Sequence, residues 1–239
     1  MSNIKEEFIS TLSHEIRTPL TSIKGFSQTM LNSWEKLDDE KKKEFLKIIL
    51  NQSQRLISLC ENVLNVAKID SNSSELVYTK IEIEKAIQNC IQIIKVNYPD
   101  FEFNFEKPKI VLYSLLDNDK TQQILLNILD NACKYSIEAK KIDIKLFNKQ
   151  DFNIVSIKNY GNYIEQKQIS KIFEKFYRVD SYKTTSVQGS GLGLYIAKNL
   201  VEKMQGKIEV VSLDEKKETE FLIYFPVYEV EKLTKNIGV

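Results

Sequence analysis

The sequence has few of the residues that mark secreted, metal-binding or membrane-spanning proteins. Its three cysteines, Cys60, Cys90 and Cys133, are widely separated, so they fit neither a disulfide framework nor a metal knuckle and favour a reducing compartment. No run approaches the roughly 18–20 uncharged apolar residues of a membrane span, and the first residues do not resemble a signal peptide. We therefore expect a cytoplasmic chain, or the cytoplasmic part of a membrane protein, with no membrane segment.

An excess of charge of either sign is also lacking. The 34 Lys and Arg residues against 33 Asp and Glu residues leave a formal net charge of +1. A chain this close to neutral gives no general attraction to nucleic acid or anionic lipid, so we expect no nucleic-acid partner. Two counts are informative. There is only one histidine, His14, and three of the only seven glycines stand close together at 189, 191 and 193.

Residues 3 to about 70 are expected to form two long helices joined by a short polar turn. Apolar residues recur at spacings of three and four, which is typical of amphipathic helices. In the first helix these are Ile9, Leu12, Ile16, Leu20, Ile23, Phe26 and Met30. In the second they are Phe45, Ile49, Leu56, Leu59, Val63, Val66 and Ile69. Asp38 or Asp39 is the expected N-cap of the second helix. A hairpin alone leaves one side of its apolar stripe exposed, so we expect a homodimeric four-helix bundle.

The polar segment Ser71–Ser74 marks a domain boundary, beyond which the pattern is mixed. Helices are expected at Glu82–Val96, Asp119–Tyr135 and Leu194–Gln205, the last with Gly206 at its C′ position. Strands are expected at 101–105, 142–146, 154–157, 207–211 and 220–225.

These strands are consecutive or joined by short connections, which favours a mostly antiparallel sheet with helices on one face. The fold class is therefore α+β. We expect a helical hairpin over 1–72, an α/β sandwich over 73–230 and a loose tail over 231–239.

The only histidine stands on the polar side of the first helix, shortly before a proline. His14 lies two residues past Leu12, off the apolar stripe, so it is expected to face solvent. Pro19 lies inside the periodic segment, where a proline costs roughly 3 kcal/mol and bends the helix. Glu15 is adjacent, and Thr18 lies at i+4 on the face of His14. A neutral imidazole is a good nucleophile, and a neighbouring carboxylate can fix its tautomer and stabilise its cation.

The segment of residues 8–23, FISTLSHEIRTPLTSI, resembles the phosphoacceptor box of two-component sensor histidine kinases nearly residue for residue. The resemblance implies that His14 takes the γ-phosphoryl group of ATP and that Glu15 assists as an acid, base or orienting group. It implies that Thr18 helps to position water when the partner is dephosphorylated. It also implies a HisKA-type dimerisation domain followed by an ATP-binding domain of the GHKL or Bergerat type.

The helix expected at Asp119–Tyr135 carries a polar face opposite the apolar Leu125, Leu129 and Ala132. This face consists of Asn127, Asn131, Lys134 and Tyr135, and it resembles the N-box of the same family. The resemblance implies that Asn131 coordinates Mg²⁺ with help from Asn127, that Lys134 reaches a phosphate and that Tyr135 flanks the nucleotide. Oxygen ligands suit Mg²⁺, which usually retains waters and phosphates as its other ligands.

A glycine-rich turn enters the helix expected at Leu194–Gln205. Such a turn and the helix N-terminus behind it favour polyphosphate. The turn resembles the family's G2 box, which implies nucleotide contacts from Gly189, Gly191, Gly193 and Leu194. The polar residues 180–188 before it resemble the ATP lid. Residues 172–180 resemble the F-box, in which Arg178 is expected to touch phosphate.

The segment that resembles the G1 box departs from the family pattern Asp-x-Gly-x-Gly. Here Asn159 stands for the aspartate that accepts a hydrogen bond from the adenine amino group, and Gly161 keeps the first glycine, while Tyr163 replaces the second. An asparagine carbonyl can still accept that hydrogen bond, as a neutral acceptor.

The resemblance covers residues 1 to about 227 and implies ATP-dependent autophosphorylation at His14. The phosphoryl group would then pass to an aspartate on the receiver domain of a separate response regulator. The altered G1 box leaves an alternative, a non-catalytic or phosphatase-only dimeric scaffold that binds the regulator. An unrelated ATPase that shares the nucleotide fold would not explain His14 in its box.

Overall fold

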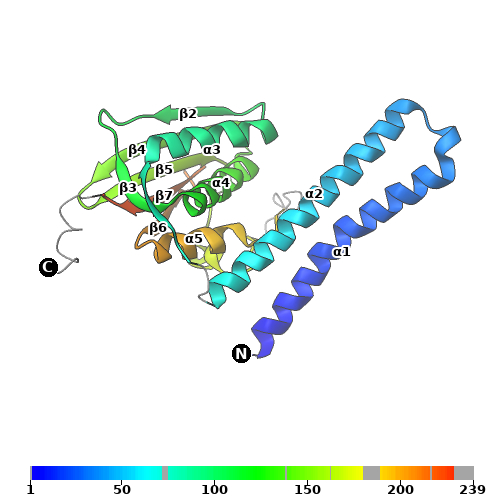
Figure 1. Cartoon of the computed structure of the whole chain (residues 1–239), viewed down its shortest axis with the longest axis horizontal. Coiled ribbons are helices and arrows are strands. Elements are labelled where there is room, and N and C mark those ends of the chain that lie inside the picture. Colours follow the sequence, from blue (N-terminus) through cyan, green and yellow to red (C-terminus); the bar gives the residue numbers. More distant parts are fainter. Residues whose placement is uncertain are drawn as a thin grey trace. The chain divides into compact units, whose positions relative to one another are not determined.

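The computed structural model describes residues 2–71, 75–137, 139–161, 163–179, 189–215 and 217–228. The chain divides into two compact units, Met1–Asn72 and Ser73–Val239. The first is a helical hairpin, and the second is built from strands and shorter helices (Figure 1).

Two 32-residue helices form the hairpin, α1 (Ser2–Ser33) and α2 (Asp39–Asp70), joined by the short 3₁₀ helix Trp34–Lys36 (Figure 1). The carboxylate of Asp38 accepts a hydrogen bond of 2.7 Å from the amide of Lys41, which identifies Asp38 as the N-cap of α2. The prediction of two long helices is therefore confirmed. Of the two residues predicted as the N-cap of the second helix, Asp38 is the N-cap.

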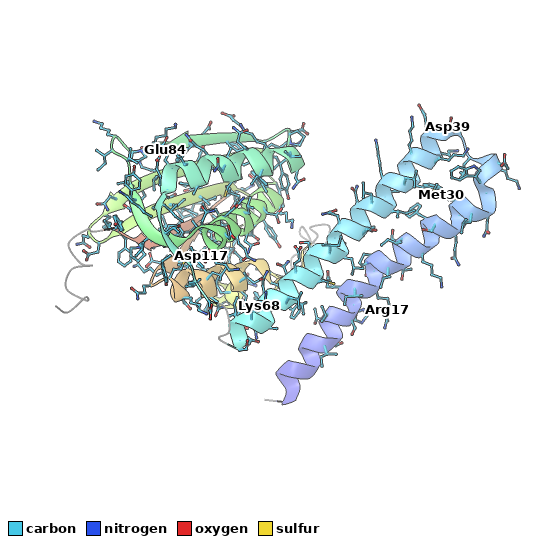
Figure 2. The ribbon with its side chains drawn as sticks, viewed as in Figure 1. Arg17, Met30, Asp39, Lys68, Glu84 and Asp117 are labelled. Carbon is cyan, nitrogen blue, oxygen red and sulfur yellow. The ribbon has the colours of Figure 1, made fainter. Side chains whose placement is uncertain are left out.

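Apolar side chains pack between α1 and α2. Met30, Leu59 and Val66 are nearly fully buried, and Met30 lies near the turn (Figure 2). The rings of Phe26 and Phe45 lie 5.0 Å apart across the hairpin. The predicted stripes therefore supply the packed rows of the two helices, except that Ile9 and Leu20 of the α1 stripe are exposed.

A second apolar row on α2 remains exposed. Its members each lie one residue after a member of the predicted stripe, and Leu50 and Leu64 are 64% and 60% exposed. The row consists of Leu46, Leu50, Ile57 and Leu64. On α1, Ile9, Leu20 and Leu31 are also exposed. The sequence analysis foresaw apolar surface left uncovered on the hairpin, but it missed this row.

The second unit contains a five-stranded sheet with the strand order β2-β4-β5-β7-β6. The strands are β2 (Glu102–Glu106), β4 (Lys141–Lys149), β5 (Phe152–Tyr160), β6 (Lys207–Leu213) and β7 (Glu218–Pro226). β2 runs parallel to β4, and the other neighbouring pairs are antiparallel, as expected for a mostly antiparallel sheet.

Three helices cover one face of this sheet: α3 (Ile83–Asn97), α4 (Asn118–Tyr135) and α5 (Gly193–Lys203) (Figure 1). Apolar side chains from alternate positions of the strands point toward the helices and are buried, including Ile144, Ile157 and Ile223. The residues between them, such as Asp143 and Lys158, are polar and lie on the other face. The α+β fold with helices on one face is therefore confirmed.

A separate two-stranded sheet of β1 (Tyr78–Glu82) and β3 (Tyr113–Asp117) was not predicted. In β1 only Ile81 is buried, so the strand has no alternating apolar pattern. In β3 a buried polar residue, Ser114, occupies a core position and accepts a hydrogen bond from Asn153. Periodicity of apolar residues therefore gave no signal for either strand.

The end of α5 differs by one residue from the prediction. Gln205, not Gly206, takes the left-handed conformation after the helix, with φ 62°. The amide of Gly206 donates 2.9 Å to the carbonyl of Val201, as the C″ residue does in a Schellman motif. Glycine is needed at 206 because a Cβ there would collide with the carbonyl oxygen of Tyr224.

Candidate functional site

The single histidine is exposed on α1, as predicted. Pro19 is buried within the same helix, and because proline has no amide hydrogen the carbonyl of Glu15 lacks its helical donor. Thr18 lies one turn after His14, and its hydroxyl donates a hydrogen bond of 3.2 Å to the carbonyl of His14. The hydroxyl therefore belongs to the same turn of helix as the imidazole.

A basic residue on α2 contacts the carboxylate beside His14. Nη2 of Arg55 lies 3.1 Å from Oε2 of Glu15, and both side chains are about three-quarters covered. A partly buried ion pair of this kind fixes a side chain more firmly than a pair in open solvent. Arg55 was missed in the sequence because it looks like an ordinary basic residue on an amphipathic helix.

The predicted polar face of α4 is present. Leu125, Leu129 and Ala132 are fully buried on one side, while Asn127 and Asn131 are half-buried on the other. Nδ2 of Asn127 is buried and has no hydrogen-bond partner among the described residues. Since a buried amide without a partner costs free energy, this atom is suited to meet a bound polar ligand.

Lys134 makes a contact that the sequence did not predict. Its ammonium lies 2.6 Å from Oδ2 of Asp130, one turn earlier on α4, and the other oxygen of Asp130 accepts a hydrogen bond of 2.8 Å from Tyr98. Burial and the neighbouring Asp130 raise the pKa of the Tyr98 hydroxyl, so it remains a donor. The carboxylate thus holds Lys134 along the helix in this structure.

The glycine-rich turn packs against the N-box helix. A Cβ on Gly193 would lie 3.7 Å from Oδ1 of Asn127, so the start of α5 lies beside this asparagine. Gly191 has a φ of +66°, and its carbonyl accepts a hydrogen bond of 3.0 Å from the amide of Phe176. Gly189 has open space around it, and Leu194 is half-buried. The G2 and F-box segments therefore adjoin, and both lie near α4.

Arg178 of the F-box acts electrostatically on Tyr135. Burial raises the pKa of the Tyr135 hydroxyl, while the positive charge of Arg178 works in the opposite direction. Two predicted nucleotide contacts from different segments are thus brought together. The predicted lid, residues 180–188, lies outside the described residues.

The altered G1 segment lies at the end of β5. Asn159 is 2% exposed, and its Nδ2 has no hydrogen-bond partner in the part of the chain that the structure describes. Gly161 follows it, and a Cβ there would collide with the carbonyl oxygen of Tyr135. The amide of Gly161 donates a hydrogen bond of 2.7 Å to the carbonyl of Lys217. Glycine at 161 therefore lets β5 end directly against the N-box helix, while Tyr163 points outward and is 40% exposed.

The second unit thus gathers two buried amide nitrogens that have no hydrogen-bond partner among the described residues, a glycine turn at a helix N-terminus and a cationic side chain near Tyr135. Amide groups can both donate to and accept from a heterocyclic base, and a helix N-terminus favours phosphate. In the first unit, an exposed imidazole lies beside an oriented carboxylate. The first arrangement suits a nucleotide, and the second suits nucleophilic chemistry at nitrogen.

Comparisons with known proteins agree with these two arrangements. Residues 4–72 match the family model of the His Kinase A (phospho-acceptor) domain. Residues 116–229 match that of the histidine kinase-, DNA gyrase B-, and HSP90-like ATPase. The sensor protein SrrB of Staphylococcus aureus (strain MRSA252) is 31% identical over 237 residues, which are 95% of this chain and 39% of SrrB.

Two solved structures are similar over most of the chain. The histidine kinase ThkA in complex with the response regulator protein TrrA has a TM-score of 0.69 at 26% identity, over 95% of this chain and 63% of that one. Full-length ShkA in complex with AMPPNP has a TM-score of 0.69 at 25% identity, over 94% of this chain and 46% of that one.

The fold and the two matched domains define the catalytic core of a phosphoacceptor-histidine kinase. The chain belongs to the two-component sensor histidine kinases, as its motifs indicated. It spans about two fifths of the length of the curated relatives it matches. In the part of the chain that the structure describes, no helix is both long and apolar enough to cross a bilayer.

Proposed function

We propose that this chain transfers the γ-phosphoryl group of ATP to His14 and then passes it to an aspartate of a response regulator. The observation that carries the proposal is the exposed imidazole of His14 next to Glu15, whose carboxylate Arg55 holds at 3.1 Å. The likeness to ThkA, solved in complex with a response regulator, supports the choice of partner.

Each unit has its own part in the proposed reaction. Residues 1–72 form the dimerisation and phosphotransfer hairpin, and residues 73–230 form the ATP-binding domain, followed by a tail over 231–239 that lies outside the described residues. The hairpin leaves Leu50, Leu64 and the rest of their row exposed, and a second copy that packs on this row would cover it. We therefore include a homodimer in the proposal.

The nucleotide site consists of residues from α4, the end of β5 and the start of α5. Asn159 meets the adenine amino group through its carbonyl oxygen, and Gly161 allows the base to approach the backbone. Gly189, Gly191, Gly193 and Leu194 accommodate the phosphates, with Tyr135, Lys134 and Arg178 at their edge. The buried nitrogen of Asn159, which has no partner among the described residues, supports this assignment and favours the kinase over the scaffold alternative.

The donor set on α4 fits Mg²⁺. Asn131 would hold the ion through its side-chain oxygen, and Asn127, whose side-chain oxygen would assist, lies one turn before it on the same face. When bound, Mg²⁺ neutralises charge on the phosphate oxygens. In the transfer of the γ-phosphoryl group, the residues of the second unit would bind and orient the nucleotide for attack by His14.

His14 is the nucleophile of the first step. An imidazole nitrogen forms a bond to the γ-phosphorus, the bond from phosphorus to the bridging oxygen breaks, and ADP leaves. Glu15 orients the ring and stabilises its positive charge, since it is anionic and adjacent. In the second step a carboxylate oxygen of the regulator attacks the phosphorus and His14 leaves. When the regulator is dephosphorylated, Thr18 positions the attacking water.

The use of ATP and the three free cysteines both fit a cytoplasmic setting.

The test is incubation of the purified chain with γ-labelled ATP and Mg²⁺, followed by acid and alkali treatment. We expect acid-labile, alkali-stable label that disappears in His14→Gln and in the presence of EDTA. Calorimetry on His14→Gln should show unchanged ATP binding, because the residue lies outside the nucleotide site. Label that persists in this variant would contradict the role of His14, and a chain that binds no nucleotide would favour the scaffold.

A further inference from the structure

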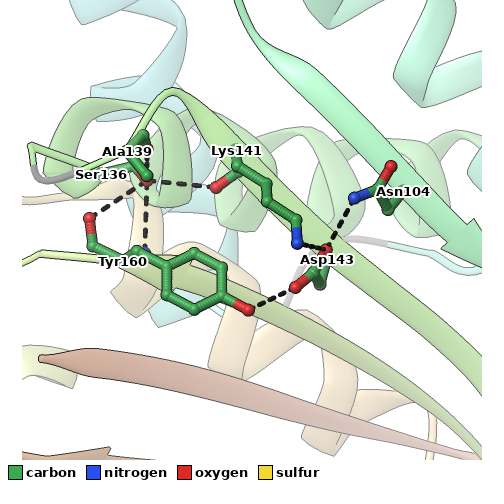
Figure 3. Close-up of polar contacts among 6 residues, drawn as sticks. All are labelled: Asn104, Ser136, Ala139, Lys141, Asp143 and Tyr160. Carbon is green, nitrogen blue, oxygen red and sulfur yellow. Dashed lines mark hydrogen bonds and ion pairs between the residues drawn. The ribbon is translucent and has the colours of Figure 1, made fainter. Parts of the chain in front are cut away.

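One buried hydroxyl group joins the end of the N-box helix to the end of β5. Ser136 directly follows Tyr135 and is 5% exposed. Its Oγ lies 2.6 Å from the carbonyl oxygen of Ala139 and 3.2 Å from the carbonyl oxygen of Lys141 (Figure 3). It also lies 3.2 Å from both the amide nitrogen and the carbonyl oxygen of Tyr160. Ser136 thus contacts both the loop after α4 and the last residue of β5.

A serine hydroxyl has one hydrogen to donate and lone pairs that accept. The shortest contact identifies the carbonyl of Ala139 as the acceptor of that hydrogen. The lone pairs then receive the amide hydrogen of Tyr160. Pairing between β4 and β5 ends at Ile142 and Asn159, so Ser136 supplies an acceptor at the position where the strand ladder stops.

The side chain of Tyr160 is held separately, on the far face of the sheet. Its hydroxyl donates to Asp143, which also accepts a hydrogen bond of 3.1 Å from Asn104 and pairs with Lys141 at 3.3 Å (Figure 3). Tyr160 is therefore fixed at two points, by its ring on one face and by its backbone at Ser136. Its two neighbours in the chain are Asn159 and Gly161, which belong to the proposed adenine site.

We propose that Ser136 is a positioning residue of the nucleotide site, which sets the distance between the N-box helix and the adenine-binding end of β5. It acts through the backbone of Tyr160 and does not touch the nucleotide. This inference rests on the proposed ATP site. Without the hydroxyl, the amide of Tyr160 loses its acceptor, and the end of β5 can move away from α4, carrying Asn159 with it.

The expected consequence is a selective loss of base recognition. The phosphate-binding turn at Gly191 and Gly193 has its own contacts and stays in place. Ser136→Ala should therefore raise the KM for ATP and leave kcat unchanged. Its preference for ATP over GTP should also fall, because guanine has a carbonyl oxygen in place of the 6-amino group from which Asn159 accepts a hydrogen bond.

The experiment is calorimetric titration of the full chain with ATP and with GTP. We expect the Kd of Ser136→Ala for ATP to rise about fivefold at unchanged stoichiometry, as loss of one neutral hydrogen bond allows. The matched control is Ser114→Ala, which removes another buried serine hydroxyl. The hydroxyl of Ser114 accepts a hydrogen bond of 3.1 Å from the side-chain amide of Asn153. Asn153 and Tyr160 stand near opposite ends of β5, about 23 Å apart along the strand.

The control separates positioning from stability. A lower melting temperature with an unchanged Kd is expected for Ser114→Ala, while Ser136→Ala should change the Kd itself. If Ser136→Ala does not fold, Ser136→Cys keeps most of the volume and weakens the hydrogen bond, so the same shift is expected. A Kd and an ATP preference equal to those of the unchanged chain, or an equal shift in the control, would overturn the inference. Failure of the unchanged chain to bind ATP would instead refute the nucleotide site, and this inference with it.

Discussion

Glu15 on α1 and Arg55 on α2 form an ion pair with a distance of 3.1 Å between Oε2 and Nη2, one residue away from His14. The pair joins the two helices of the hairpin next to His14, the proposed phosphoacceptor. It places a positive charge behind the carboxylate that is proposed to orient the imidazole. The conformation of Glu15 is therefore determined by a residue 40 positions later in the chain.

Removal of the Arg55 side chain should slow phosphorylation of His14 without changing the affinity for ATP. In Arg55→Ala the carboxylate of Glu15 is free to rotate, and we expect autophosphorylation to slow about tenfold, which corresponds to about 1.4 kcal/mol of positioning. Arg55→Lys keeps the positive charge and loses the planar guanidinium. Its autophosphorylation rate should lie between those of the unchanged chain and Arg55→Ala. Initial rates of label incorporation measure the effect, and the Kd for ATP should not change.

Lys47→Ala is the control for this prediction. Lys47 is an exposed cation on the same helix, about 12 Å before Arg55 along the axis. A rate for Arg55→Ala equal to that of the control would show that the pair plays no part in the reaction.

Asn159 should recognise two atoms of adenine because its amide has both an acceptor and donors. Its carbonyl oxygen is expected to accept from the amino group, and its Nδ2, which has no partner in the described part of the chain, is expected to donate to ring nitrogen N1. ATP should then bind about fivefold tighter than 1-deaza-ATP, which has a C–H at that position. Asn159→Asp has no donor, so this preference should largely disappear. An equal preference in both proteins, measured by calorimetry, would contradict the second contact.

The exposed row on α2 should hold two copies of the chain together. Glutamate at positions 50 and 64 would introduce charge into an apolar contact, so Leu50→Glu with Leu64→Glu should shift the protein toward monomer by at least tenfold in Kd. Sedimentation equilibrium of the full chain measures the shift. Asn51→Glu, at an exposed polar position about 100° around the same helix from Leu50, should remain dimeric. A dimer that survives the double change would place the contact elsewhere.

The stability of the second unit should depend on pH through Asp143. Burial acts to raise the pKa of Asp143, but hydrogen bonds from Tyr160, Asn104 and Lys141 outweigh it and hold the pKa below the usual value. A lowered pKa stabilises the fold above the unfolded value of about 3.9, and this stabilisation is lost as the pH falls through the folded pKa.

Asp143→Asn should therefore lower the free energy of unfolding at neutral pH by about 0.5–1 kcal/mol, a modest amount because the side chain is partly exposed. The difference from the unchanged chain should shrink as the pH falls below about 3.9 and disappear below the folded pKa of Asp143. Urea titrations at neutral pH and through the acid range measure it. Glu102→Gln on the neighbouring strand serves as the control, and a difference that persists in acid would rule out the proposed linkage.

Several elements follow from the sequence because their residues carry the signal locally. The stripe through Phe26 and Met30 predicts α1, and the alternation in β7 predicts a half-buried strand. The buried serine in β3 interrupts such an alternation, so the strand is visible only in its pairing with β1. Gln205 occupies the left-handed position where the glycine beside it was expected, because the collision at Tyr224 requires glycine at 206 instead.

The sequence by itself identified the family and predicted the two domains and His14 as the phosphoacceptor, because these depend on residue types at short, fixed spacings. The tertiary structure alone decided which side chains meet: Arg55 with Glu15, Lys134 with Asp130, and Ser136 with the backbone of Tyr160. Of these pairs, only Lys134 and Asp130 lie within a single turn of helix. The others join residues 24 to 40 positions apart, and such contacts arise only when helices and strands pack against each other.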